Sequence, residues 1–340
     1  MDVNDNIYFL VNPNAKSGRG MLTWKEIRTG LKEAKLKRGR DYDVFFTECA
    51  GDASRITKIL TDPDLYQGGR SRLLLFVIGG DGTLDEVING FCLKSAEYVT
   101  IGYIPAGSGN DFARSFGALD TDQVLTLVRH PHRAEKVALD FGRMEVITPV
   151  KSIRRFVVST GIGYDAGVCH RIHNSVTKEF FNRLKVGKIG YSVLGAIELL
   201  ACKPSDGWIE TDEGKMLFTN MYFTSVHIHP YEGGGYMFAP GAKADDGMLS
   251  VCMVHDLSKW KFFLFLFKML LKDFSGLDRR YCTWINTRKI KLYTHSPRPV
   301  HCDGELMGYQ KEFAAVCESG KKAINFVKPV LLEAGERGDK

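Results

Sequence analysis

A run of apolar residues in this chain passes directly into a glycine-rich turn and then into a helical pattern. The letters LLLFVI at 73–78 predict a buried strand, GGDGT follows at 79–83, and apolar side chains recur at helical spacing over 84–93. A strand, a tight turn and a helix in this order are the repeating unit of parallel sheets covered by helices. The same order recurs before and after this segment, so we predict an α/β domain with a parallel sheet over residues 1–133.

The neighbouring segments supply the other elements of this domain. Apolar runs at 7–11, 42–47 and 100–104 predict strands, and amphipathic patterns at 21–37 and 52–60 predict helices. The carboxyl ends of parallel strands meet at one edge of the sheet, and such folds usually bind their ligands there. The loops that follow these strands are therefore the best candidates for a binding site.

After residue 133 the pattern changes from alternating strands and helices to successive strands. Turn signals such as Asp246-Gly247 and Asp303-Gly304 separate segments rich in β-branched and aromatic residues, while 188–201 and 257–271 are helical. A chain of 340 residues also exceeds the size of one ordinary core. We predict a second, mainly antiparallel β-sandwich-like domain over 134–327. Its expected strands are 134–147, 153–160, 216–228, 248–254, 284–294 and 312–327.

Three loops rich in glycine and small residues follow strands of the first domain. They read NPNAKSG at 12–18, GGDGT at 79–83 and PAGSGND at 105–111. Glycine lets the backbone approach a phosphate with its N–H groups pointing inward, and the following helix adds the positive end of its dipole. Neither a Walker A sequence nor a GxGxxG fingerprint is present. The three loops together predict a phosphate site of another kind.

Asp81 stands out within the second loop, because a carboxylate repels a phosphate unless it binds Mg²⁺, orients a donor or accepts a proton. Its presence favours chemistry over simple anion binding. The alternative is a tight strand-to-helix turn in which Asp81 caps the helix.

Two acidic turns in the second domain are further candidates. The sequence HCDGELMG places Asp303 and Glu305 on either side of Gly304, where both side chains could face one site. A plain β-hairpin turn is the alternative, since Asp-Gly is a strong hairpin signal. In KADDGM, Asp246 offers oxygen atoms that suit a hard cation, and again a simple turn is the alternative.

Five segments, in this order and spacing, resemble the diacylglycerol kinase catalytic-domain family of lipid kinases. They are VNPNAKSGRG, GGDGTLDEVINGF, IPAGSGNDFARSFG, APGAKADDGMLSV and HCDGELMG. That family includes soluble bacterial diacylglycerol kinases and the sphingosine and ceramide kinases. The resemblance implies ATP bound in a cleft between the α/β domain and the β-sandwich domain, and a return of residues 328–340 to the first domain.

The resemblance also implies which residues form the sites. Glu305 is the expected proton acceptor, as in bacterial diacylglycerol kinases, and Asp81 is the second choice, as in sphingosine kinases; Asp303 lies beside Glu305. A structural Mg²⁺ is expected on Asp246 with backbone oxygens of Lys243 and Met248. Nucleotide contacts are expected at Asn12, Pro13, Asn14, Lys16, Thr47, Gly79, Gly80, Asp81, Gly82, Thr83, Leu84, Asp85 and Ser108.

One of these positions departs from the family pattern. Asp85 stands where asparagine is common after GGDGTL. The change adds a negative charge near the expected phosphates, so it bears on nucleotide preference and on the demand for a metal ion.

The function that these features predict is an ATP- and Mg²⁺-dependent kinase that phosphorylates a lipid hydroxyl, with diacylglycerol as the leading substrate. The alternatives are a kinase for sphingosine, ceramide or another glycerolipid, then an NAD kinase, and finally a non-catalytic regulator that binds lipid or nucleotide.

The expected location is the cytoplasm, with peripheral attachment to the membrane that holds the lipid. The N-terminal MDVNDN is acidic where a signal peptide is basic, the cysteines form no CxxC pair, and the apolar run at 260–271 is too short to span a bilayer. The net charge of +6 permits an acidic surface as partner, but no nucleic-acid motif appears. For the segment LSKWKFFLFLFKMLLKDF, bilayer contact, core packing and a homodimer contact all stay open.

Overall fold

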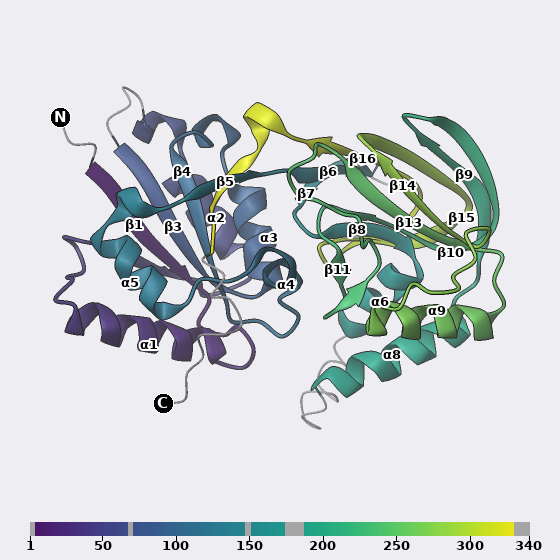
Figure 1. The fold of residues 1–340 in the computed structure, drawn as a ribbon, viewed down its shortest axis with the longest axis horizontal. Helices are drawn as coiled ribbons and strands as arrows, with labels where there is room; N and C mark the ends of the chain where they lie inside the picture. Colours follow the sequence, from purple (N-terminus) through teal and green to yellow (C-terminus); the bar gives the residue numbers. More distant parts are fainter. Residues whose placement is uncertain (1–3, 67–70, 147–150, 174–186, 330–340) are drawn as a thin grey trace. The chain divides into compact units, whose positions relative to one another are not determined.

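The structure is a computed structural model that describes residues 4–66, 71–146, 151–173 and 187–329 of the chain (Figure 1). The described residues form two compact units. The first runs up to Leu139 and resumes at Lys321, and the second is Asp140–Gly320.

The first unit is built on a six-stranded sheet. Neighbouring strands are parallel except for β5, which runs antiparallel to β17. The strand order is β2 (Asp43–Phe46), β1 (Asn4–Val11), β3 (Ser71–Gly79), β4 (Val99–Pro105), β17 (Ile324–Val327) and β5 (Lys136–Leu139). The helices are α1 (Arg19–Glu33), α2 (Asp52–Leu60), α3 (Asp81–Gly90), α4 (Asp111–Phe116) and α5 (Thr121–Arg129). Short 3₁₀ turns lie at Pro63–Tyr66, Leu93–Ser95, Pro131–Arg133 and Gly320–Lys322.

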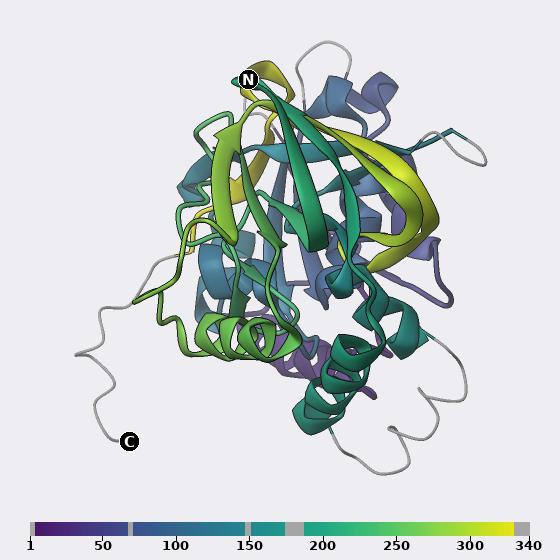
Figure 2. The same cartoon turned by 90° about the vertical axis from the view of Figure 1, so that its right-hand side faces the viewer.

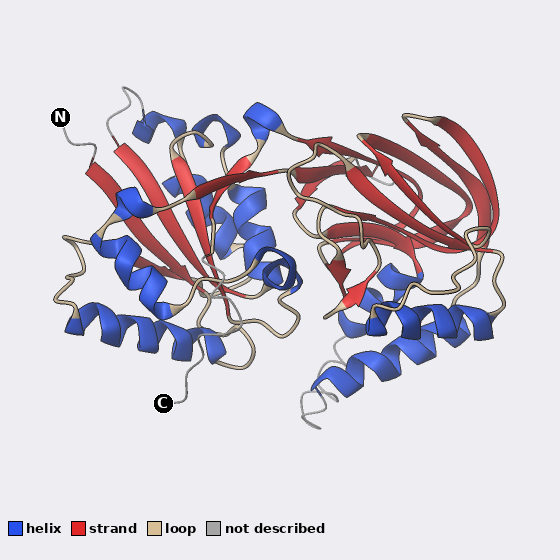
Figure 3. Cartoon of the chain, in the orientation of Figure 1, coloured by secondary structure: helices blue, strands red, loops and turns tan. Residues whose placement is uncertain are grey.

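Helices cover both faces of this sheet (Figure 3). Phe9 and Phe76 stack on one face with ring centroids 5.0 Å apart, and Trp24 of α1 packs on Phe9 at 5.1 Å. The next residues along the strands, Leu10 and Leu75, point to the opposite face and are also fully buried. Burial on both sides explains why these strands read as continuous apolar runs rather than as alternating ones.

The second unit is built on a nine-stranded antiparallel sheet. The long strands β10 and β15 each pair with β8 at one end and with β9 at the other, so β8 and β9 lie end to end between them. The strands are β6 (Phe141–Val146), β7 (Ser152–Phe156), β8 (Ser159–Gly163), β9 (Ser205–Thr211), β10 (Gly214–His227), β13 (Leu249–His255), β14 (Cys282–Thr287), β15 (Lys289–Cys302) and β16 (Glu305–Glu318).

Among the described residues, three helices and a small hairpin accompany this sheet (Figure 2). They are α6 (Tyr164–His173), α8 (Gly187–Ala201), α9 (Lys259–Leu271) and the paired strands β11 (Tyr231–Glu232) and β12 (Tyr236–Met237). None of the helices within the described ranges is long and apolar enough to cross a membrane. The expected fold class, a parallel α/β domain followed by an antiparallel β domain, is confirmed.

The chain crosses between the two units at other places than the pattern predicts. The run 312–327 reads as one strand, but Gly320 turns the chain with a φ of 63°, and β17 then pairs with β4 and β5 in the first sheet. The first crossing falls after Leu139 rather than after residue 133, because β5 also belongs to that sheet. Apolar alternation identifies a strand, but it does not say which sheet the strand joins.

Candidate functional site

The loop after β1 is tied to the start of α3. Val11 and Ile78 are register partners, so β1 and β3 end together. The backbone N–H of Asn12 donates to the Ile78 carbonyl at 2.9 Å, and its side-chain Nδ2 donates to Thr83 Oγ1 at 3.0 Å. Asn12 and Thr83, two residues expected to contact nucleotide, therefore meet at the carboxyl edge of the sheet.

The loops after β3 and β4 touch through their glycines. The Ala106 N–H donates to the Gly79 carbonyl at 2.7 Å. A Cβ atom on Gly107 would lie only 2.5 Å from Gly80 Cα, and one on Gly80 would lie 3.1 Å from Gly107 Cα. No side chain fits at residue 107 without moving the backbone of residue 80, and the space at residue 80 is tight as well. This close approach leaves bare backbone at the point where the loops come together.

The third part of this edge is the left-handed turn that leads into α1. Lys16, Ser17 and Gly18 have φ angles of 43°, 53° and 98°. Asn14 is held by its N–H, which donates to Asn12 Oδ1 at 3.1 Å. The Lys16 side chain is exposed. The turn thus presents a lysine and small residues beside Asn12, a composition that suits an anion.

Asp81 binds the start of α4 rather than capping its own helix. Gly80 is the N-cap of α3 and supplies no side-chain bond. The Asp81 carboxylate instead accepts the N–H groups of Asp111 at 3.2 Å and Phe112 at 3.4 Å. Burial raises the pKa of Asp81, although these amide donors oppose the shift. Both oxygens of Asp81 are therefore already engaged in joining the second loop to the third.

The other expected nucleotide residues divide into accessible and buried positions. Ser108 is exposed on the third loop, and Thr47 is buried at the end of β2, where its N–H donates to the Val11 carbonyl at 2.9 Å. Leu84 and Asp85 are fully buried inside α3, and the Asp85 carboxylate accepts a hydrogen bond from Asn89 Nδ2 at 2.9 Å. The charge of Asp85 is thus placed within the helix packing, away from the exposed part of the loops. The side chains of Leu84 and Asp85 do not join the accessible group.

The acidic turn of the second unit is a tight hairpin connection between β15 and β16. Asp303 and Gly304 have φ angles of 48° and 85°, and Cys302 pairs with Glu305 across the turn. The Asp303 carboxylate accepts three backbone N–H groups, from Val157 at 2.7 Å, Val158 at 2.9 Å and Ser159 at 2.8 Å. Burial raises the pKa of Asp303 to about 6 against the effect of these donors. Asp303 anchors the turn.

Glu305 contrasts with Asp303 and Asp81. Its side chain is half-buried, and its carboxylate makes no hydrogen bond or ion pair with the part of the chain that the structure describes. A proton acceptor needs a lone pair that is not already occupied. Of the three acids expected to be catalytic, Glu305 is the one whose carboxylate is available.

A buried ionic cluster lies next to the Asp303-Gly304 turn. His301 Nε2 lies 3.3 Å from Asp165 Oδ2 and 3.3 Å from Glu232 Oε1, and His301 Nδ1 lies 3.3 Å from the Gly304 nitrogen. Burial disfavours a charged imidazole, but the Glu232 carboxylate raises the pKa of His301 well above its ordinary value. The donor atoms also lie within 4.8 Å of one another, as metal ligands do. A protonated imidazole carries hydrogens on both ring nitrogens and has no lone pair for a metal ion, so the cluster is an ion pair rather than a metal site.

Substituting His301→Gln is expected to lower the free energy of unfolding by about 3 to 5 kcal/mol, because Asp165 and Glu232 lose the cation between them in a buried site. Adding Asp165→Asn should recover part of this loss, since one uncompensated charge then disappears. Urea denaturation of both variants measures these effects. The matched control is His295→Gln, an exposed position on the same strand, with an expected change within about 0.5 kcal/mol. Equal stability of the two single variants would contradict the ionic cluster.

The expected cation turn contains a second carboxylate that the sequence pattern does not reveal. Asp246 is exposed, and its Oδ1 accepts the Met248 N–H at 3.0 Å. The buried Asp140, from the start of β6, accepts the Gly247 N–H at 2.7 Å. Burial raises the pKa of Asp140, and the charge of Asp246 adds to the shift. Two carboxylates therefore share this loop with the backbone of Lys243, and the second Asp246 oxygen is a candidate ligand for a hard cation.

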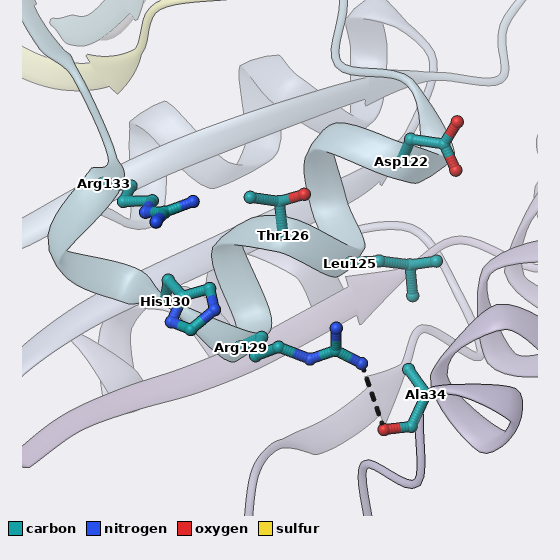
Figure 4. A pocket seen from close by; sticks show the side chains of 7 residues that line it. All are labelled: Ala34, Asp122, Leu125, Thr126, Arg129, His130 and Arg133. Atoms are coloured by element: carbon teal, nitrogen blue, oxygen red, sulfur yellow. Dashed lines mark hydrogen bonds between the residues drawn. The ribbon is translucent and has the colours of Figure 1, made fainter.

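A hollow of about 320 Å³ in the first unit lies away from these loops (Figure 4). It adjoins the carboxyl end of α1, whereas the three loops follow the carboxyl ends of the strands. Arg129 Nη2 crosses it and donates to the Ala34 carbonyl at 3.3 Å. The lining residues are Ala34, Asp122, Leu125, Thr126, Arg129, His130 and Arg133. The hollow is therefore separate from the candidate site.

The fold is an α/β domain with a parallel sheet followed by an antiparallel β domain, and two family models match these two parts. Residues 6–144 match the model of the diacylglycerol kinase catalytic domain, and residues 157–319 match that of the YegS C-terminal NAD kinase beta sandwich-like domain. The chain belongs to the diacylglycerol kinase catalytic-domain family of lipid kinases.

Similar proteins are found in Bacillus species. YtlR of Bacillus subtilis, provisionally named a lipid kinase, is 28% identical over 303 residues, which cover 88% of this chain and 93% of YtlR. The diacylglycerol kinase of Bacillus subtilis is 24% identical over 295 residues, covering 87% of this chain and 88% of that enzyme.

A solved structure has the same fold. The crystal structure of a Bacillus anthracis protein, provisionally assigned as a diacylglycerol kinase, superposes with a TM-score of 0.70. It shares 21% identity, covering 98% of this chain and 100% of that one.

Proposed function

We propose that this protein is an ATP- and Mg²⁺-dependent kinase that transfers the γ-phosphate to a lipid hydroxyl, converting diacylglycerol to phosphatidic acid at the cytoplasmic face of a membrane. The observation that carries the proposal is that three loops meet at one edge of the sheet. There the backbones of Gly80 and Gly107 lie too close together for a side chain at residue 107. The family of the chain supports lipid as the substrate class, and the likeness to a named diacylglycerol kinase supports the particular lipid.

In this proposal the first unit binds the triphosphate. Backbone N–H groups around Gly80 and Gly107 face the phosphates, and Lys16 adds a positive charge on the exposed turn. Asn12 and Thr83 fix the loops to one another, so the binding surface is formed before ATP arrives. Mg²⁺ bound to the triphosphate would neutralise charge that develops during transfer.

The second unit supplies the proton acceptor. Glu305 takes the proton of the lipid hydroxyl while Asp303, held by three amides, fixes the turn that carries it. A separate Mg²⁺ on Asp246 and Asp140 would stabilise the neighbouring loop, and a cation there would relieve the repulsion between their carboxylates. That ion has a structural role in the proposal.

The test is to supply γ-labelled ATP with mixed micelles of diacylglycerol, sphingosine, ceramide or monoacylglycerol, and separately with NAD. Labelled phosphatidic acid as the main product, lost when EDTA removes Mg²⁺, is the expected result. If another lipid is labelled instead, the protein is still a lipid kinase, but its substrate is that lipid rather than diacylglycerol. Labelled NADP alone, or no labelled product from any acceptor, would overturn the proposal.

A further inference from the structure

Helix α9 carries large apolar side chains on two opposite faces. Phe262, Phe265, Leu266 and Met269 point into the second unit and are buried. The other face remains exposed to a degree unusual for residues of this size. Its members and their exposed fractions are Trp260 (67%), Phe263 (42%), Leu264 (41%), Phe267 (51%), Leu270 (43%) and Leu271 (59%). Four of these ten large apolar residues are therefore buried within the unit, and six are exposed.

The end of α8 extends this exposed face. Figures 1 and 2 show α8 and α9 side by side, and Lys259 Nζ at the start of α9 donates to the Leu200 carbonyl at the end of α8. Leu200 is 74% exposed and Ile197 is 43% exposed. We call the six exposed residues of α9 together with Ile197 and Leu200 the apolar face. It comprises aliphatic and aromatic side chains from two helices that the Lys259–Leu200 hydrogen bond joins.

Lysines accompany the apolar face, and acidic residues are missing from its helix. Lys259, Lys261, Lys268 and Lys272 lie along α9 and its C-cap, and the sequence 257–272 contains no Asp or Glu. Lys268 lies 3.5 Å from Asp273, just beyond the helix. An apolar face with lysines along its margins complements a layer of anionic headgroups above acyl chains, at about 1 kcal/mol for each lysine near such a surface.

We propose that the apolar face of α8 and α9 docks this protein onto an anionic phospholipid membrane; the proposal rests on the proposed function, because a lipid kinase must reach its substrate in the bilayer. The helix has 13 residues, about 20 Å at 1.5 Å per residue, which is too short to span a bilayer. It therefore lies in the plane of the interface with its exposed aromatic residues among the headgroups and upper acyl chains. Trp260 at its first turn suits this polar boundary.

Vesicle co-sedimentation with the full-length protein tests the docking. On vesicles of phosphatidylglycerol and phosphatidylcholine in equal parts, Phe263→Ser/Phe267→Ser should reduce partitioning at least about 30-fold. The matched control is Leu65→Ser/Leu217→Ser, which removes two residues that are 57% and 78% exposed elsewhere, with partitioning unchanged. Lys261→Gln/Lys272→Gln should reduce partitioning about 30-fold on anionic vesicles and have little effect on neutral ones. Equal partitioning of the phenylalanine variant and the control would overturn the proposal.

Further readouts distinguish membrane docking from misfolding, from loss of catalysis and from self-association. A blue shift of tryptophan fluorescence on vesicle binding should disappear in Trp260→Phe, and thermal unfolding should show that each variant is folded. A water-soluble short-chain diacylglycerol should be phosphorylated equally by wild type and the phenylalanine variant, whereas Glu305→Gln should bind vesicles without turnover. If the protein binds vesicles through α9 but shows no kinase activity, the proposed function is wrong and the docking proposal stands.

If the phenylalanine variant loses a concentration-dependent dimerisation but still binds vesicles, the apolar face is a contact between two copies of the chain. That result would overturn the docking proposal.

Discussion

Replacing Glu305 with glutamine is expected to lower kcat by about 10²- to 10⁴-fold, the usual contribution of a general base. Glutamine keeps the size of the side chain but cannot accept the proton of the lipid hydroxyl. The half-buried Glu305 carboxylate has no hydrogen bond or ion pair with the described residues, so its loss should leave the fold intact. The KM for ATP should stay within about threefold, because the three phosphate loops belong to the other unit.

Initial rates with labelled ATP and micellar diacylglycerol, together with thermal unfolding, measure both parts of this prediction. Glu312→Gln is the matched control, since Glu312 lies on the same strand and pairs with Lys291 at 2.8 Å. It should retain full turnover. A Glu305→Gln protein that is folded and fully active would remove Glu305 from the mechanism and leave Asp81 as the next candidate.

Gly107→Ala should damage both ATP use and stability, although it adds only one methyl group. That group would lie 2.5 Å from Gly80 Cα and 2.8 Å from Asn110 Oδ1, so the loops after β3 and β4 must move apart. We expect the free energy of unfolding to fall by about 1 to 3 kcal/mol, as for other overpacked sites. Because displacement of about 1 Å in a positioned site can cost 10²-fold in rate, kcat/KM for ATP should fall by about that factor.

Gly82→Ala provides the comparison for stability, measured by urea denaturation. A Cβ atom at Gly82 has no neighbour within 4 Å, so the free protein should tolerate it without loss, and alanine is also the better helix former. If Gly107→Ala is as stable as wild type and uses ATP normally, the two loops do not need their present contact, and the proposed phosphate surface is wrong.

Much of the architecture is predictable from local patterns. Strands buried on both faces, such as Leu73–Ile78, appear as unbroken apolar runs. Glycine residues mark the loops that follow these strands. The sequence pattern places the start of helix α3 at Leu84, but the helix begins at Asp81. The difference arises because helical spacing is visible only where apolar and polar side chains alternate. The placement of β17 depends on long-range pairing, which no local pattern contains.

The candidate site is predictable only in part, for a similar reason. The family resemblance selects Asn12, Asp81 and Glu305 as candidates, but it cannot show that the Asp81 oxygens are engaged and those of Glu305 are not. The partners of His301 come from α6 and from β11, so sequence separation hides them. The available signal is position: His301 lies two residues before the Asp303 turn, between the buried residues Val300 and Cys302.

The late return of β17 also governs the order in which the molecule can assemble. During synthesis β4 is made long before β17, its partner on one side. The entire second unit is made before β17 (Ile324–Val327) can fill the position between β4 and β5. Until then β4 presents an open edge of unpaired backbone groups. Completion of the first sheet consequently waits until the whole second unit has been synthesised.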